Sequence, residues 1–194
     1  MKTPDRSAKR EPVWPDDPAA AYEKAFNTAL RSLTAASRTR HQVEQLLVRR
    51  GAPAVVIDRV LDRLVEVGLL NDVEFARRWA NSRSNSRAAS RRVLGMELSR
   101  KGISSADIDI ALADIDADDE HCAAADLVSR KLASSTVDLT DHQQRLKLRQ
   151  RMVNMLMRRG HSPTIAIGIV DDVLLQRTEH SSGADQDDEA FSLP

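Results

Sequence analysis

The sequence is poor in cysteine and aromatic residues, and it contains no long hydrophobic run. Cys122 is the only cysteine, so no internal disulfide can form and a reducing compartment is expected. Aromatic residues are 3% of the chain, which disfavours a β-sandwich and favours helices packed through leucine, valine and alanine. No apolar segment approaches the ~20 residues of a membrane-spanning helix, and residues 1–18 lack the apolar core of a signal peptide. These absences predict a cytoplasmic protein that does not act in a membrane.

The sequence also lacks the patterns that active sites and metal sites require. Its histidines show no i, i+4 pairing, and His121 precedes Cys122, where helical neighbours do not face each other. The acidic run 114–120 is similar to a calcium loop, but it has Asp119 where that loop needs glycine, and it lacks the closing glutamate. No glycine-rich phosphate loop occurs. The sequence therefore predicts no catalytic residue, no metal and no cofactor.

The formal net charge of zero hides segments of alternating sign. Residues 31–101 hold fifteen basic and seven acidic residues, a balance of +8, whereas residues 102–126 hold eight acidic residues and no Lys or Arg. Residues 127–177 return to +5, with nine basic against four acidic residues, and residues 178–194 carry five acidic residues and no basic one. A partner would respond to these local fields rather than to the overall charge.

Hydrophobic residues three and four positions apart predict nine helices that form three copies of one unit. Each copy is marked by a helix end with a leucine four residues before a glycine and a basic pair immediately before that glycine. The three ends are Leu47–Gly51, Leu98–Gly102 and Leu156–Gly160. Their glycines are 51 and 58 residues apart, which fits a three-helix unit better than a two-helix repeat of ~34 residues. We therefore predict an all-α fold of three tandem three-helix repeats that stack into an elongated, curved array.

Composition and capping signals divide the chain into five segments. They are a disordered tail over 1–18, repeat 1 over 19–70, repeat 2 over 71–117, repeat 3 over 118–177 and an acidic, disordered tail over 178–194. Trp14 lies in the first tail and is expected to have no specific role. The first apolar stripe is expected to comprise Tyr22, Phe26, Leu30 and Leu33. Helix starts are expected at Thr39 with Gln42, Asn71 with Glu74, and Thr140 with Gln143.

The stretch from Gly68 to Ile103 combines two apolar stripes with a basic cluster. Phe75 and Trp79 on one helix, and Leu94 and Leu98 on the next, are predicted core positions. The turn and the second helix carry the basic cluster Arg83, Arg87, Arg91, Arg92, Arg100 and Lys101, and only Glu97 opposes it there. Like charges on a short helix repel, so the cluster indicates a partner that neutralises it. Arginine suits bidentate contact with carboxylate or phosphate.

The basic pairs of the three helix ends are Arg49–Arg50, Arg100–Lys101 and Arg158–Arg159. A cation in the last helical turn gains roughly 0.3–1 kcal/mol from the helix dipole, so any one pair is explained as a helix ending. Three pairs at equivalent positions of a stacked array would line one side at a regular pitch. That arrangement favours a polyanionic or acidic, repetitive partner.

The central stretch resembles the signature of the RecX family, bacterial regulators of the RecA recombinase. The resemblance rests on Gly68-Leu69, Asn71-Asp72, Phe75-Ala76, Arg83, Glu97-Leu98 and Lys101-Gly102-Ile103, and the repeats extend it over roughly residues 20–177. The chain departs from the family where the turn meets the second helix, since it has Arg87-Ala88-Ala89 instead of the usual glycine.

The resemblance implies a non-enzymatic regulator that binds RecA and RecA–single-stranded DNA filaments. It would inhibit recombinase, ATPase and coprotease activity and so modulate recombinational repair and the SOS response. The ten basic residues given above would contact RecA or DNA phosphates, with weak direct DNA binding, and the protein is expected to be a monomer. The residues themselves leave two alternatives open. One is a stand-alone DNA-binding helical protein, disfavoured by the few Asn and Gln beside the arginines. The other is a helical-repeat adaptor unrelated to DNA.

Overall fold

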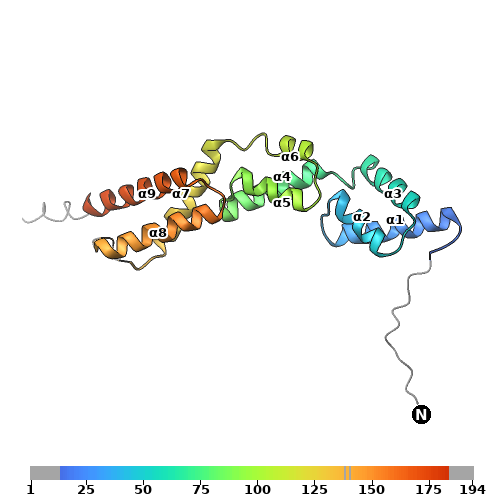
Figure 1. Ribbon diagram of the computed structural model, residues 1–194, viewed down its shortest axis with the longest axis horizontal. Coiled ribbons are helices and arrows are strands. Elements are labelled where there is room, and N and C mark those ends of the chain that lie inside the picture. The colour runs from blue at the N-terminus through green and yellow to red at the C-terminus, as the bar shows by residue number, and fades with distance from the viewer. Residues whose placement is uncertain (1–13, 138, 140, 184–194) are drawn as a thin grey trace, which may run out of the picture. The chain divides into compact units, whose positions relative to one another are not determined.

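A computed structural model of the chain describes residues 14–137, 139 and 141–183. These residues form helices and contain no strand, which confirms the predicted all-α class built from three-helix units. In order (Figure 1), the helices are α1 (Pro18–Ala35), α2 (Arg40–Arg49), α3 (Ala54–Glu66), α4 (Asp72–Arg87), α5 (Arg91–Arg100), α6 (Ser105–Ala111), α7 (Ala117–Ala133), α8 (His142–Arg158) and α9 (Pro163–Gly183).

The two predicted tails lie largely outside the described residues, which exclude 1–13 and 184–194. Two parts of them are described. Residues 14–17 lead into α1, where a carboxylate oxygen of Asp17 accepts a hydrogen bond from the N–H of Ala20 at 2.9 Å and caps the helix. At the other end, α9 continues to Gly183, six residues beyond the predicted limit of repeat 3 at residue 177.

The described residues form two compact units. The first contains residues 14–78 and 97–111, and the second contains residues 79–96 and the described residues from 112 to 183. The helices α4 and α5 contribute residues to both units. The division therefore crosses the predicted middle repeat, and the repeat boundaries at residues 70 and 117 stay a prediction.

The core of the first unit is formed by α1, α2 and α3. The largest fully buried side chains there include Leu47, Leu61 and Leu64. The buried face of α1 consists of alanines at positions 21, 25 and 29, whereas Tyr22 and Phe26 are only partly buried against the same core. The predicted aromatic stripe is therefore wrong about which face of α1 is most deeply buried. Alanine lets this helix approach its neighbours closely, because its side chain adds little beyond the backbone.

The core of the second unit is formed by α7, α8 and α9. Val128, Leu156 and Ile169 are fully buried in it, and Ala88 from the α4–α5 turn joins them. The helices α8 and α9 are also connected at the surface, where the guanidinium of Arg149 donates two hydrogen bonds to the carboxylate of Asp171 at 2.5 and 2.7 Å. This double contact holds the pKa of Asp171 below its usual range.

Most predicted helix starts are confirmed. Thr39 and Gln42 form a capping box on α2, and the side-chain oxygen of Asn71 accepts a hydrogen bond from the N–H of Glu74 at 2.9 Å. The start predicted at Thr140 is wrong. Asp141 caps α8 instead, through a carboxylate oxygen that accepts hydrogen bonds from two backbone N–H groups, and Thr140 lies outside the described residues. Aspartate is among the preferred N-cap residues, and it accepts these bonds as a carboxylate.

The three helix-end glycines adopt a left-handed conformation. The φ angles of Gly51, Gly102 and Gly160 are 75°, 80° and 97°. A residue with a side chain pays roughly 1–2 kcal/mol in this region, because its Cβ approaches the following carbonyl oxygen. Glycine therefore allows the middle helix of each repeat (α2, α5 and α8) to end at an equivalent point of that repeat.

Candidate functional site

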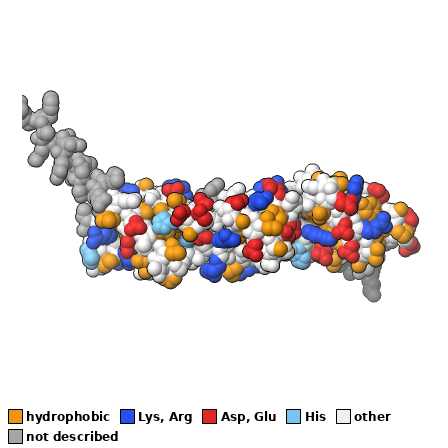
Figure 2. All heavy atoms as spheres, turned by 90° about the horizontal axis from the view of Figure 1, so that it is seen from above, with side chains coloured by type: hydrophobic (Ala, Val, Ile, Leu, Met, Phe, Trp, Pro, Cys, Tyr) orange, Lys and Arg blue, Asp and Glu red, His pale blue; other side chains and the backbone are white. Residues whose placement is uncertain are grey.

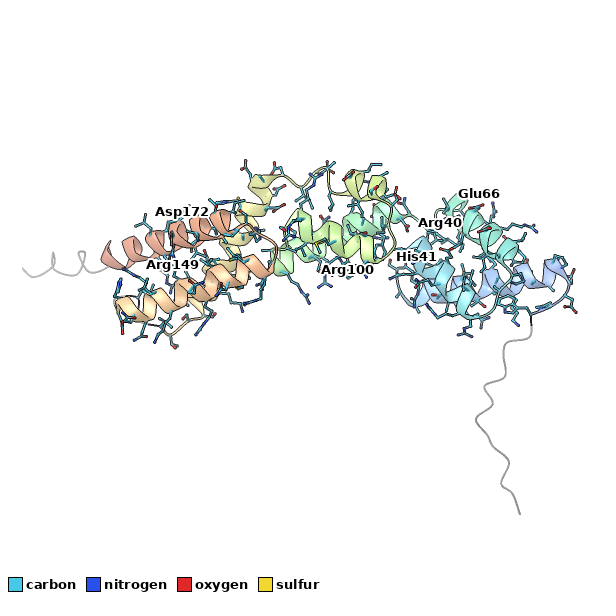
Figure 3. All side chains as sticks on the ribbon, in the orientation of Figure 1. Arg40, His41, Glu66, Arg100, Arg149 and Asp172 are labelled. Atoms are coloured by element: carbon cyan, nitrogen blue, oxygen red, sulfur yellow. The ribbon has the colours of Figure 1, made fainter. Side chains whose placement is uncertain are left out.

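Within the first unit, the start of α2 contacts the end of α5. The hydroxyl of Thr39 is fully buried and donates a hydrogen bond to the carbonyl of Lys101 at 2.8 Å. His41 lies so close to Gly102 that a Cβ at that position would overlap its side chain. Figure 3 labels His41 near the start of α2 and Arg100 at the end of α5. Glycine is thus required here both by its φ angle and by the approach of another helix.

The same contact recurs within the second unit, between the start of α5 and the end of α8. The N–H of Ser90 donates a hydrogen bond to the carbonyl of Arg159 at 3.0 Å. Ser90 and Val93 occupy the space that a Cβ at Gly160 would need. We call each of these contacts a repeat contact: the start of one middle helix sits on the helix-end glycine of the next middle helix.

The repeat contacts give the two members of a basic pair different roles. The second members, Lys101 and Arg159, are partly buried, and their carbonyls accept the hydrogen bonds of the repeat contacts. The first members, Arg100 and Arg158, are exposed. In the first repeat both Arg49 and Arg50 are exposed. Sequence reasoning treated the members of a pair as equivalent, because the partner of each carbonyl lies tens of residues away.

The α4–α5 turn contains an alanine in the left-handed region. Ala88 has a φ of 48°, at the position where the RecX family was expected to have glycine. Two side chains from the end of α8 hold this turn. The guanidinium of Arg159 donates to the carbonyl of Arg87 at 2.6 Å, and the buried imidazole of His161 donates to the carbonyl of Ala88 at 2.8 Å. Arg159 is therefore a structural residue as well as a member of a basic pair.

Three of the predicted binding residues, Arg87, Arg158 and Arg159, lie together at this turn. Burial lowers the pKa of the Arg159 guanidinium, and the positive charges of Arg158 and Arg87 lower it further. The side chains of Arg87 and Arg158 are exposed, as is that of Arg92 on the first turn of α5, where the guanidinium lies 3.8 Å from the sulfur of Met96. The second unit thus presents a concentrated positive charge around the end of α8.

Arg91 differs from its neighbours because α7 supplies an acidic group beside it. The N–H of Arg91 donates to a carboxylate oxygen of Glu120 at 2.8 Å, and its guanidinium lies 3.4 Å from the carbonyl oxygen of Ile115. Glu97 is therefore not the only acidic residue that opposes the cluster, because Glu120 lies beside Arg91. Glu120 is 29 residues away in sequence, so local charge counting did not reveal it.

The aromatic residues of α4 also bind predicted site residues. Phe75 is buried as expected, but Trp79 is only partly buried, so its prediction as a core residue is wrong. The guanidinium of Arg83 lies 4.4 Å from the centre of the Trp79 ring, a cation–π distance, and the ammonium of Lys101 lies 5.8 Å from the Phe75 ring. The aromatic faces thus restrict the two cations.

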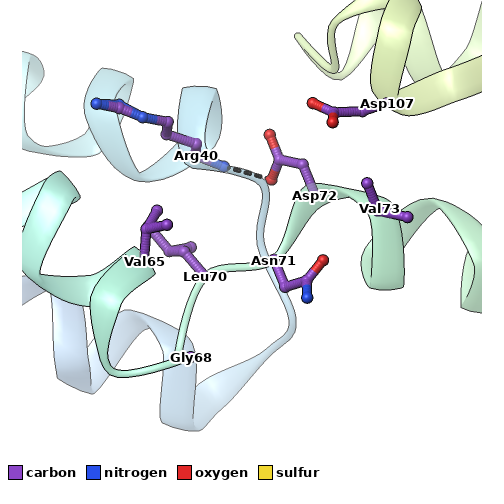
Figure 4. A pocket seen from close by; sticks show the side chains of 8 residues that line it. All are labelled: Arg40, Val65, Gly68, Leu70, Asn71, Asp72, Val73 and Asp107. Carbon is purple, nitrogen blue, oxygen red and sulfur yellow. Dashed lines mark hydrogen bonds between the residues drawn. The ribbon is translucent and has the colours of Figure 1, made fainter. Parts of the chain in front are cut away.

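A cavity of about 420 Å³ lies beside the repeat contact of the first unit (Figure 4). It is lined by Arg40, Val65, Gly68, Leu70, Asn71, Asp72, Val73 and Asp107. The carboxylate of Asp72 accepts a hydrogen bond from the N–H of Arg40 at 2.9 Å, while the Arg40 guanidinium pairs with Asp62 at 2.8 Å. Burial raises the pKa of Asp72, and the charge of Asp107 adds to that rise. Asp72, which the sequence marked only through the family resemblance, therefore connects α4 to α2.

On the face seen in Figure 2, acidic and basic side chains are interspersed. Among the described residues, no three His, Cys, Asp or Glu side chains are grouped as metal ligands would be. In the same part of the chain, no helix has both the length and the apolar character needed to cross a membrane.

Comparison with protein families matches two segments of the chain. Residues 25–64 match the first three-helix domain of RecX, and residues 71–112 match its second three-helix domain. The second match contains both sides of the α4–α5 turn and the helix end at Gly102. Each match lies within one of the predicted repeats.

Curated relatives extend the similarity over most of the chain. A regulatory protein RecX from Mycolicibacterium smegmatis is 40% identical over 163 residues, covering 84% of this chain and 86% of the relative. The protein of the same name from Streptomyces coelicolor is 39% identical, covering 90% and 89%, respectively. The crystal structure of RecX from Lactobacillus salivarius has a TM-score of 0.64 at 22% identity, covering 81% of this chain and 99% of that one, and supports the fold.

Proposed function

The chain belongs to the RecX family of regulatory proteins, and from this premise we propose that it binds RecA and RecA–single-stranded DNA filaments. Binding inhibits the recombinase and the coupled ATPase and coprotease activities. The protein thereby modulates recombinational repair and the SOS response. It acts by occupying a partner surface, not by catalysis.

The observation that carries this proposal is that the two residues of a basic pair differ: the second is held in a repeat contact and the first is exposed. In both repeat contacts the second member is held by a hydrogen bond to its carbonyl, which fixes the backbone from which the first member projects. Arg100 and Arg158 are therefore exposed cations on backbones that are already ordered. An ordered backbone removes the cost of ordering the main chain on binding, which leaves roughly 0.5–1.5 kcal/mol for each long side chain that is immobilised.

A filament is a suitable partner for cations displayed at equivalent points of successive repeats. Its protomers present the same acidic side chains at intervals, and its DNA presents phosphates. Arg87, Arg92 and Arg158 can form bidentate contacts with either group. In this mechanism the bound protein spans neighbouring RecA protomers and blocks filament growth, and DNA phosphates add weak direct affinity.

Co-sedimentation tests the proposal. The protein is mixed with RecA–single-stranded DNA filaments, with naked single-stranded DNA and with duplex DNA, each at several salt concentrations. We expect saturable binding to the filament, well above binding to either DNA, and inhibition of strand exchange over the same concentration range. Equal binding to naked duplex DNA would favour the stand-alone DNA-binding protein. Binding to none of the three would favour an adaptor unrelated to DNA.

A further inference from the structure

Among the described residues, α2 is the first of the three middle helices, and it ends on a helix-end glycine like the other two. In the two repeat contacts, the carbonyl before the helix-end glycine accepts a hydrogen bond from the start of the preceding middle helix. The end of α2 carries the same elements, the carbonyl of Arg50 followed by Gly51 with a φ of 75°. No middle helix precedes α2 within the described part of the chain, so a different group meets this helix end.

Trp14 occupies this position. Its indole N–H donates a hydrogen bond to the carbonyl of Arg50 at 2.6 Å. The ring also lies against Gly51, with its nitrogen 3.5 Å from where a Cβ would stand. The carbonyl therefore gains a donor and the open face of the glycine gains a neighbour, as in the repeat contacts. Trp14 is thus not the residue without a role that the sequence predicted.

Two further contacts fix the indole. The ammonium of Lys24 on α1 lies 4.9 Å from the centre of the Trp14 ring, and the ring packs against the core of α1–α3. Tryptophan suits this position because its ring offers one N–H donor, an apolar body and an electron-rich face. In the repeat contacts the corresponding carbonyl accepts a hydrogen bond from the hydroxyl of Thr39 or from the backbone N–H of Ser90.

We propose that Trp14 is the end cap of the repeat series. It binds intramolecularly at the end of α2 and replaces the middle helix that a preceding repeat would supply. The terminal repeats of such proteins need special surfaces, because they lack one neighbour. Residues 14–17 are therefore part of the folded first unit, and Trp14 covers the end of α2.

Hydrogen exchange of the full-length protein tests this proposal at the two helix ends of the first unit. In the Trp14→Ala protein we expect the amides of Gly51 and Ala52 to exchange roughly two- to tenfold faster, the factor given by one net hydrogen bond. The amides of Gly102 and Ile103 serve as the internal control, because their contact with α2 is unchanged. Trp14→Phe, which keeps a ring but loses the N–H, should give an intermediate increase.

Fluorescence provides a second measurement that does not depend on the Trp14→Ala protein. The chain has two tryptophans, so in the Trp79→Phe protein Trp14 is the only tryptophan, and excitation that spares Tyr22 reports on it alone. We expect its emission to be blue-shifted and less quenched by acrylamide than that of N-acetyltryptophanamide. It should become solvent-like when the protein unfolds in urea. Solvent-like emission in the native protein, or unchanged exchange at Gly51 and Ala52 in Trp14→Ala, would overturn the proposal.

Discussion

The imidazole of His161 donates a hydrogen bond to the carbonyl of Ala88, 73 residues earlier in the chain. Ala88 is the one non-glycine residue with positive φ among those described. Two residues later, the N–H of Ser90 donates to the carbonyl of Arg159. The guanidinium of Arg159 in turn donates to the carbonyl of Arg87. The turn that starts α5 is therefore held from both sides by the end of α8, which explains how an alanine is retained in a conformation that favours glycine.

Replacing Ala88 with glycine is expected to change the free energy of unfolding by less than ~1 kcal/mol, because three effects nearly cancel. Relief of the left-handed conformation gains about 1–2 kcal/mol. The greater entropy of glycine in the unfolded chain costs about 0.5–1 kcal/mol, and the lost buried methyl costs about 0.8 kcal/mol. The matched control is Ala124→Gly, a fully buried position inside α7, which should cost ~1.5–2 kcal/mol. Equal losses in urea unfolding would show that the φ angle of Ala88 stores no energy.

Replacing His161 with phenylalanine should destabilise the protein by about 1–3 kcal/mol, because the carbonyl of Ala88 is left buried without its donor. The matched control is His142→Phe at an exposed position on α8, which should change stability by no more than ~0.5 kcal/mol. Thermal or urea unfolding of the two variants measures the difference. If both variants match the wild type, the His161–Ala88 bond contributes nothing to stability.

Alanine should be tolerated less well at Gly102 than at Gly51. Both positions have positive φ, so both substitutions carry the cost of roughly 1–2 kcal/mol for a side chain in that region. At Gly102 the added Cβ also overlaps His41, whereas at Gly51 it would stand at ordinary contact distance from Trp14. Urea unfolding should therefore rank Gly102→Ala as the less stable variant. The reverse order would contradict the close approach of α2 to the end of α5.

The wild-type protein should gain stability relative to Asp72→Asn as the pH falls. Burial raises the pKa of Asp72 in the folded state above its usual value of 3.8. A group with a raised folded pKa favours folding most below its unfolded pKa, and this contribution is lost as the pH rises through the folded pKa. Urea unfolding of both proteins between about pH 3 and about pH 7 measures the difference. A difference that is constant, or that favours the variant in acid, would contradict the assigned direction.

Features that depend on local chemistry were predictable from the sequence. The capping boxes and the left-handed glycines follow from residues within one helical turn of each other, and Thr39 and Gly102 were placed correctly for this reason. The helix-period pattern likewise gave the all-α class. Asp141 was missed because two adjacent residues, Thr140 and Asp141, could each cap α8, and the sequence does not decide between them.

Features that depend on distant partners were not predictable. Arg91 meets Glu120, Trp14 meets Arg50 and His161 meets Ala88, and each pair is separated by 29 residues or more. Hydrophobic spacing also failed on α1, where the buried alanines carry little hydrophobic signal compared with Tyr22 and Phe26. The candidate basic residues could therefore be named, but not divided into structural and exposed members.

The proposed function depends most directly on the exposed arginines of the second unit. Arg87 and Arg92 are suitable for charge reversal because both side chains are exposed, whereas Arg91 contacts α7 and Arg159 holds the α4–α5 turn. Arg130→Glu with Lys131→Glu is the matched control, because it makes the same charge change at exposed positions on α7. Both double variants are expected to unfold cooperatively, and the control should lose about 1–2 kcal/mol because its two glutamates stand in the last turn of α7.

Inhibition of RecA-mediated strand exchange by these two double variants is the most direct measurement. Arg87→Glu with Arg92→Glu should need at least ~tenfold more protein for half-inhibition, since close charge pairs at interfaces contribute ~1.5 kcal/mol or more. The control on α7 should inhibit like the wild type. Full inhibition by the Arg87/Arg92 variant at wild-type concentration, with a normal melting curve, would contradict binding through this surface.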